Sequence, residues 1–213
     1  MKRGEKMQEM MPFWFAGGDD YDVLCQNFRG AIQGACKAGS TLDEPWRTTV
    51  DGKMAQIIMF DQLSRNAFRG TDEAFQYDDA ALDIARDMSQ MLISTCQKGD
   101  GDQDENPIIL PTLSGEVYTP YLQFFVSPLM HSEALDDHTL ALQVCDFSAE
   151  VVPKHMTKMY ENVKQFEVEH KDVIDRFGRY PHRNAKLGRK STPEELEWLS
   201  NEDELPGWAK SQG

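Results

Sequence analysis

Five polar residues in one short stretch are too specific in chemistry for a helix surface that only faces water. Gln62, Asn66 and Arg69 follow one another at intervals of four and three residues, which places them on one face of a helix. Asp61 and Arg65 are four residues apart, the spacing of an ion pair along a helix. A water-facing helix would carry interchangeable Lys and Glu. We therefore predict a partly buried polar network, completed by a second stretch of the chain.

The second stretch spans residues 176–189 and holds four of the ten arginines of the chain. Arginine suits bidentate recognition of a carboxylate or phosphate. One interpretation is a cationic pocket for an anionic small molecule or a peptide carboxylate. The candidate ligand-binding residues are Asp61, Gln62, Arg65, Asn66, Arg69, His170, Arg176, Arg179, Arg183 and Asn184. The alternative is a structural salt-bridge network in which the arginines pair with Asp61, Glu133, Asp172 and Asp175.

Three further residues could act as general acids or bases, namely His131, Glu133 and His182. His170 lies between apolar positions four residues before and after it, a pattern more typical of a core histidine than of a ligand. The H-E-x-x-H spacing does not occur, and no metal site is predicted. There is also no phosphate loop or dinucleotide fingerprint, and no cofactor is identified.

The overall charge restricts the partners of the chain. A net charge of −14, from 22 basic and 36 acidic residues, argues against nucleic acid and against anionic membrane surfaces. The four cysteines are far apart, and no run of about 18 apolar residues could span a membrane. We expect a soluble cytoplasmic protein, with a trimmed organellar targeting peptide as the alternative.

Apolar periodicity predicts an all-α fold of about seven helices packed as antiparallel pairs in a single domain over residues 1–213. No sustained alternation typical of strands occurs. The expected helices cover about residues 21–38, 50–68, 78–92, 120–130, 137–151, 154–177 and 192–199. Residues 1–12 and 201–213 are expected to be tails, and residues 97–115 a loop insertion.

Three runs, FDQLSRNAFRGTDEAF, PLMHSE and RFGRYPHRNAKLGRKSTPEE, resemble the family called domain of unknown function 924. The resemblance covers about Phe13 to Leu199. It implies an all-α fold similar to tetratricopeptide-repeat proteins, and no established activity. The family usually has proline where this chain has Ser64, so a softer kink is expected there.

Three hypotheses about function follow from these residues. The first is a pocket that binds an anionic ligand. The second is an enzyme in which His131, Glu133 or His182 transfers protons to or from that ligand. The third is a module that binds peptides or proteins in a groove, with the polar residues serving the structure alone.

Overall fold

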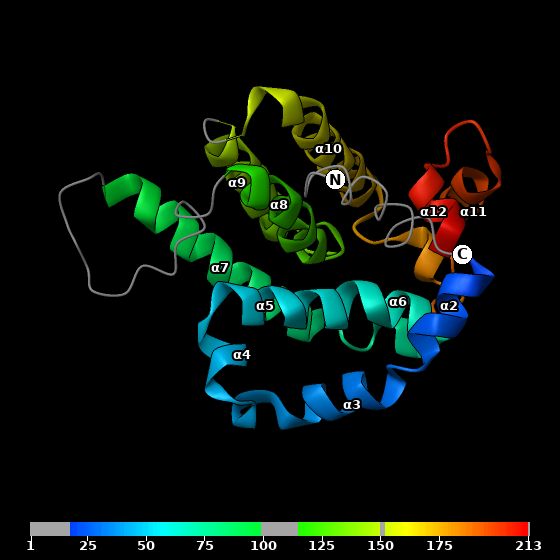
Figure 1. Ribbon diagram of the computed structural model, residues 1–213. Coiled ribbons are helices and arrows are strands. Elements are labelled where there is room, and N and C mark those ends of the chain that lie inside the picture. Colours follow the sequence, from blue (N-terminus) through cyan, green and yellow to red (C-terminus); the bar gives the residue numbers. More distant parts are fainter. Residues whose placement is uncertain (1–17, 99–114, 150–151, 213) are drawn as a thin grey trace.

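The computed structural model describes residues 18–98, 115–149 and 152–212, and this part of the chain contains only helices and loops (Figure 1). The predicted all-α class is therefore confirmed. The tail expected over residues 1–12 and most of the loop expected over residues 97–115 lie outside the described residues.

The first half of the fold consists of short helices and one long helix, α7. Its elements are α2 (Asp19–Gln26), α3 (Arg29–Ala38), α4 (Glu44–Thr48), α5 (Val50–Ile57), α6 (Ser64–Ala67) and α7 (Asp78–Lys98). The single helix expected over residues 21–38 is interrupted at Asn27 and Phe28, which separate α2 from α3.

The first polar stretch lies on one continuous helical rod. This rod, which we call the α5–α6 rod, runs from α5 through a π-helical turn, Ile58–Leu63, into α6. A π-turn adds a residue to the turn and re-aims the side chains beside it, and such turns are frequent at functional sites. The hydroxyl of Ser64, in the place where the family usually has proline, donates to the carbonyl of Phe60 at 2.5 Å. The turn places Asp61 and Gln62 inward, where both are buried.

The second half contains three long helices followed by two short ones. Its elements are α8 (Gly115–Met130), α9 (Leu135–Ser148), α10 (Thr157–Phe177), α11 (Pro193–Ser200) and α12 (Gly207–Gln212). Gly178 ends α10 in the left-handed conformation (φ 67°), as a C-terminal glycine does. Thr192 and Glu195 form both halves of a capping box at the start of α11. Residues 207–212, which we expected in a tail, form α12.

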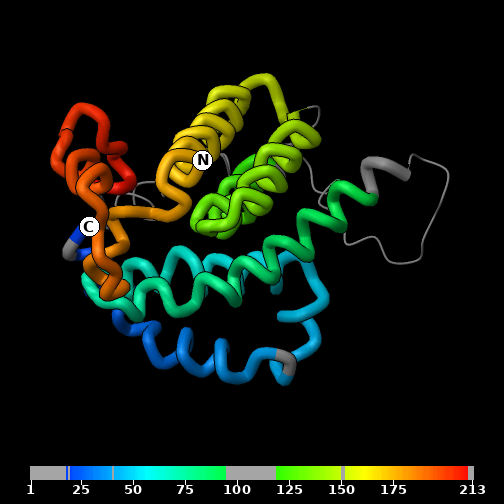
Figure 2. The backbone as a smooth tube through the Cα atoms, turned by 180° about the vertical axis from the view of Figure 1, so that it is seen from behind, coloured from blue at the N-terminus to red at the C-terminus, as the bar shows by residue number. Residues whose placement is uncertain are grey.

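The helices form two groups on either side of the α5–α6 rod. In Figure 1, α3 and α4 lie below the rod, and α8, α9 and α10 lie above it. Helix α7 runs along the rod on its far side in Figure 1, which is the near side in Figure 2. The largest apolar core joins α5, α7, α8, α9 and α10, with Leu122, Phe125 and Leu129 fully buried. A smaller core joins the end of α10 to α11 and α12. The two polar stretches meet between these cores.

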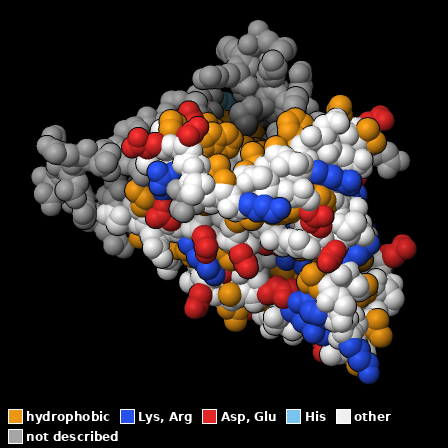
Figure 3. All heavy atoms as spheres, turned by 90° about the horizontal axis from the view of Figure 1, so that it is seen from below, with side chains coloured by type: hydrophobic (Ala, Val, Ile, Leu, Met, Phe, Trp, Pro, Cys, Tyr) orange, Lys and Arg blue, Asp and Glu red, His pale blue; other side chains and the backbone are white. Residues whose placement is uncertain are grey.

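The surface carries charges of both signs. On the face shown in Figure 3, Lys and Arg side chains alternate with Asp and Glu rather than gathering in one basic patch. Within the described part of the chain, no helix is long and apolar enough to cross a membrane.

Candidate functional site

A buried carboxylate, Asp61, lies at the centre of the polar network. Its Oδ1 contacts Nδ1 of His131 at 2.5 Å, and its Oδ2 accepts hydrogen bonds from the Ser127 hydroxyl at 2.7 Å and from the side-chain amide of Gln62. Arg65 lies 4.0 Å from the same Oδ1. Burial would raise the pKa of Asp61, but the adjacent His131, then Arg65 and Ser127, lower it overall, so the group is a carboxylate. We call Asp61, Gln62, Ser127 and His131 the Asp61 centre.

Arg65 and Arg183 lie beside this centre and share one acid, Asp78. Arg65 contacts both carboxylate oxygens of Asp78, at 2.7 and 2.8 Å, and Arg183 lies 3.5 Å from one of them. Arg183 also donates to the carbonyl of His131 at 2.9 Å. Burial, and next the charge of Arg65, lower the pKa of Arg183. Both guanidinium groups lie over the ring of Phe75, at 4.8 and 5.2 Å from its centroid.

His170 and His182 both pack against the aromatic rings of Tyr180 and Trp208. Trp208 of α12 stacks on His170 at 3.8 Å between ring centroids and meets His182 edge-on at 5.5 Å. Burial lowers the pKa of His170 to about 3 and that of His182 to about 2, with help from neighbouring positive groups. Both imidazoles are therefore neutral near pH 7. Neither ring nitrogen of His182 has a partner or contact with solvent, so the structure does not support it as an acid–base group.

Glu133 is held in a strong ion pair and does not face an open site. Arg189 binds both of its carboxylate oxygens, at 2.6 and 2.9 Å, and the backbone N–H of Tyr180 donates to it at 2.8 Å. Burial alone would raise the pKa of Glu133, but these hydrogen bonds lower it overall. Glu133 thus anchors the loop after α10, and the structure does not favour it as a proton carrier.

Arg179 is bound in the same way by a carboxylate that we did not predict. It donates to both oxygens of Glu195, at 2.6 and 2.8 Å, and Asn184 donates to Glu195 at 3.2 Å. Arg176 lies further out, half-exposed, with Glu194 at 3.0 Å and Glu204 at 3.5 Å. Both arginines thus bind carboxylates of the protein, as in the structural alternative, but none of these carboxylates is among the four that the alternative named.

Arg69 and Asn66 lie at the end of α6, beside a surface hollow. Arg69 binds Asp22 of α2 at 2.6 Å and donates to Asn66 at 2.5 Å. The hollow has a volume of about 280 Å³, including its open mouth. Its lining residues are Arg65, Arg69, Gly70, Thr71, Ala74, Phe75 and Lys186. We call it the basic hollow, because it contains three basic side chains and no acidic one.

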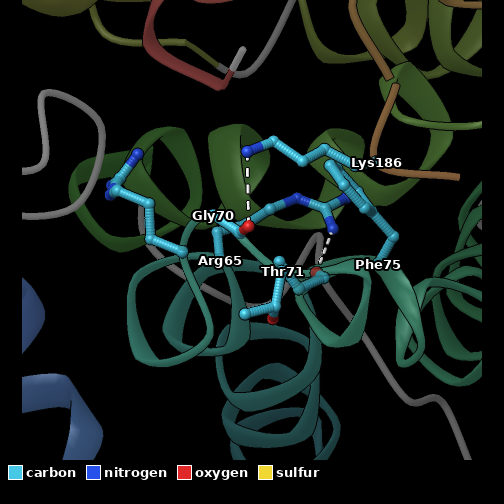
Figure 4. A pocket seen from close by; sticks show the side chains of 7 residues that line it. Arg65, Gly70, Thr71, Phe75 and Lys186 are labelled. Carbon is cyan, nitrogen blue, oxygen red and sulfur yellow. Dashed lines mark hydrogen bonds between the residues drawn. The ribbon is translucent and has the colours of Figure 1, made fainter. Parts of the chain in front are cut away.

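Lys186 closes one side of the basic hollow from the loop before α11. Its ammonium donates to the carbonyl of Gly70 at 3.3 Å, and Figure 4 shows it reaching across to that carbonyl while Arg65 enters the same space from the rod. No carboxylate of the described residues forms an ion pair with Lys186. Its positive charge is therefore available to a ligand.

The sequence analysis missed several partners in the network. Asp78 entered the predictions only as the first residue of an expected helix, and Ser127 carried no signal in its apolar helix. A second buried pair, His138 and Glu167, binds at 2.8 Å, and His138 also contacts the carbonyl of Ser132 at 2.9 Å. The helical spacing of His138 on α9 and Glu167 on α10 could have placed both inward, but not opposite each other. Among the described residues, no group of three His, Cys, Asp or Glu side chains could hold a metal ion.

Comparisons with known proteins give a family and a fold. One solved structure, described as a protein of unknown function ATU0120 from Agrobacterium tumefaciens, is similar with a TM-score of 0.54 and 23% sequence identity. The match covers 93% of this chain and 99% of the other. At this identity the likeness shows the fold alone, and the tetratricopeptide-like description stays a prediction. No curated protein matches the chain.

The family model described as "Bacterial protein of unknown function (DUF924)" matches residues 3–203. This range includes the Asp61 centre, the basic hollow and the loop that carries Lys186. The chain belongs to the DUF924 family.

Proposed function

We propose that this protein binds a small anionic ligand in the basic hollow. The observation that supports this most directly is the composition of the lining, which has three basic side chains and no carboxylate. Charge-assisted hydrogen bonds from Arg and Lys are the strongest that a protein offers to a carboxylate or phosphate group. The hollow is open to solvent, so a ligand can enter without unfolding the site.

The three cations differ in how freely they could bind a ligand. Arg65 is tied to Asp78 and to the carbonyl of Ala74, and Arg69 is tied to Asp22. Lys186 has only a carbonyl partner among its described contacts. We therefore assign Lys186 the largest share of ligand binding, with Arg65 and Arg69 supplying a positive field from the opposite wall.

Titration calorimetry with inorganic phosphate, sulfate and citrate tests this proposal. Lys186→Ala should weaken binding by about fivefold to tenfold, the loss of about one charge-assisted hydrogen bond. Lys190→Ala is the matched control, because it removes the same charge from an exposed position four residues along the same loop. Equal loss in the two variants would mean that only general charge is involved, and it would refute the proposal.

A second variant should change affinity in the opposite direction. Asp22 binds Arg69 at 2.6 Å and competes with any ligand for that guanidinium. Asp22→Asn keeps the shape of the side chain and removes its charge, so it should tighten anion binding by a few fold. An unchanged or weaker affinity in Asp22→Asn would show that Arg69 does not contribute to the site.

A further inference from the structure

The Asp61 centre includes one imidazole nitrogen that the described part of the fold leaves without a hydrogen bond. We infer that Asp61 and His131 form an acid–base pair in which Nε2 of His131 exchanges a proton with a bound substrate. In this pair His131 is the catalytic residue and Asp61 is the positioning residue. The substrate class, an anion with an acidic C–H or O–H group, rests on the proposed function, but the pair itself does not.

The carboxylate is fixed in place before any substrate arrives. Asp61 is fully buried, and the Ser127 hydroxyl and the Gln62 amide both bind its Oδ2. Its Oδ1 is therefore directed at Nδ1 of His131, at 2.5 Å. A carboxylate accepts hydrogen bonds and does not donate them, so Nδ1 carries a proton, and in the neutral form of the ring the lone pair lies on Nε2. A buried carboxylate that fixes the tautomer of a histidine in this way is the arrangement by which proteins prepare a general base.

His131 combines two features that no other described histidine of the network has together. Its Nδ1 contacts a carboxylate, and no described residue forms a hydrogen bond with its Nε2, while its side chain is 11% exposed. Both nitrogens of His138 are bound, and both nitrogens of His182 are enclosed. Nε2 of His170 also has no described hydrogen bond, but its Nδ1 is bound to a carbonyl of its own helix at 2.6 Å and not to a carboxylate.

Arg65 connects this pair to the basic hollow. Its guanidinium lies 4.0 Å from the same Asp61 oxygen that contacts His131, and it also lines the hollow. The other groups that face His131 are Arg183, which binds its backbone carbonyl, and the ring of His170 at 6.1 Å. An anion held in the basic hollow would therefore bind beside the guanidinium that contacts the Asp61 centre.

The proton transfer balances without any further reagent. The substrate C–H or O–H bond breaks, its electron pair stays on the substrate, and the proton moves to Nε2. The resulting imidazolium is stabilised by the Asp61 carboxylate, and the new negative charge on the substrate by Arg65. Return of the proton to another atom of the substrate would complete an isomerisation and restore the neutral imidazole.

Two measurements on the whole protein test the pair without knowing the substrate. Nitrogen NMR of ¹⁵N-histidine-labelled protein reports the tautomer of each imidazole, and we expect the proton of His131 on Nδ1. Diethyl pyrocarbonate acylates an unprotonated, accessible imidazole nitrogen. We expect it to modify His131 in the native protein at pH 8, while His138, His170 and His182 react only after unfolding. A proton on Nε2 of His131, or protection of His131 from the reagent, would overturn the inference.

Asp61→Asn then separates a positioning role from a packing role. The amide of the new side chain can donate to Nδ1, which moves the ring proton to Nε2. We expect the tautomer of His131 to invert and its acylation at pH 8 to slow by about tenfold, an energetic change of about 1.4 kcal/mol. Unchanged tautomer and rate in a folded variant would leave Asp61 with a packing role only. Loss of phosphate binding in Lys186→Ala tests the basic hollow independently, so the two proposals can fail separately.

Discussion

The ion pair between Glu195 and Arg179 gives a quantitative test of the conclusion that part of the basic stretch is structural. Glu195 is 2% exposed and accepts hydrogen bonds from Arg179, Asn184 and the backbone N–H of Thr192. The hydrogen bonds from Arg179, and next the one from Thr192, lower its pKa to about 2. The ordinary glutamate pKa is about 4.3, so the native state favours the carboxylate by about 3 kcal/mol at pH 7.

The sign of the pH dependence follows from the direction of this shift. Because the pKa of Glu195 is lower in the folded state, its contribution to stability is fully present above about pH 4.3 and is lost as the pH falls towards 2. Glu195→Gln keeps the shape and one acceptor oxygen but removes the charge. The variant should therefore unfold about 3 kcal/mol more easily at pH 7, and this difference should fall by about 1 kcal/mol at pH 3.5.

Urea unfolding followed by far-ultraviolet circular dichroism measures both quantities. Glu194→Gln is the matched control, because Glu194 is the preceding residue, pairs with Arg176 and has a side chain that is 60% exposed. An exposed pair is worth about 0.2–1 kcal/mol, so this control should be nearly as stable as the parent protein. Equal destabilisation in the two variants would show that Arg179 is not anchored as described, and that it could bind a ligand instead.

Three further predictions concern side chains that support the network. Tyr180→Phe removes the hydroxyl that donates to the carbonyl of Met130 and should cost about 1–2 kcal/mol in urea unfolding. Glu167→Gln keeps a hydrogen-bond partner for the buried His138 and should cost less stability than Glu167→Leu. The leucine variant leaves His138 without this partner, at a cost of about 3 kcal/mol or more in free energy of unfolding, and equal costs in the two variants would contradict this pairing. Trp208→Ala removes the ring that stacks on His170 and should make both His170 and His182 reactive towards diethyl pyrocarbonate in the native protein, whereas Trp208→Phe should largely protect them.

The sequence predicts the helices well where the local chemistry specifies them. The capping box at Thr192 and the left-handed glycine at residue 178 lie where the residue types require them, because caps depend on a few neighbouring residues. The π-turn over Ile58–Leu63 was not predicted, since one extra residue per turn leaves the apolar period nearly unchanged. The break at Asn27 was missed for a similar reason, because the apolar stripe continues across it.

The candidate site was harder to predict, because ion pairing depends on tertiary packing. The two polar stretches do come together, and Glu133 does pair with an arginine of the second stretch, Arg189. Yet Asp175 pairs with Lys171 instead, and the main partner of Arg179 is Glu195, a carboxylate that the sequence did not point to. A pattern of charges identifies residues that need partners but does not say which partners the packing supplies.

The described charges beside the Asp61 centre are balanced before any ligand binds. Arg65 and Arg183 supply two positive charges, and Asp61 and Asp78 supply two negative ones. His170 adds none near neutral pH, because burial lowers its pKa to about 3. An anion that enters the basic hollow therefore meets one cation without a described carboxylate partner, Lys186, whereas the charges beside the Asp61 centre are already paired.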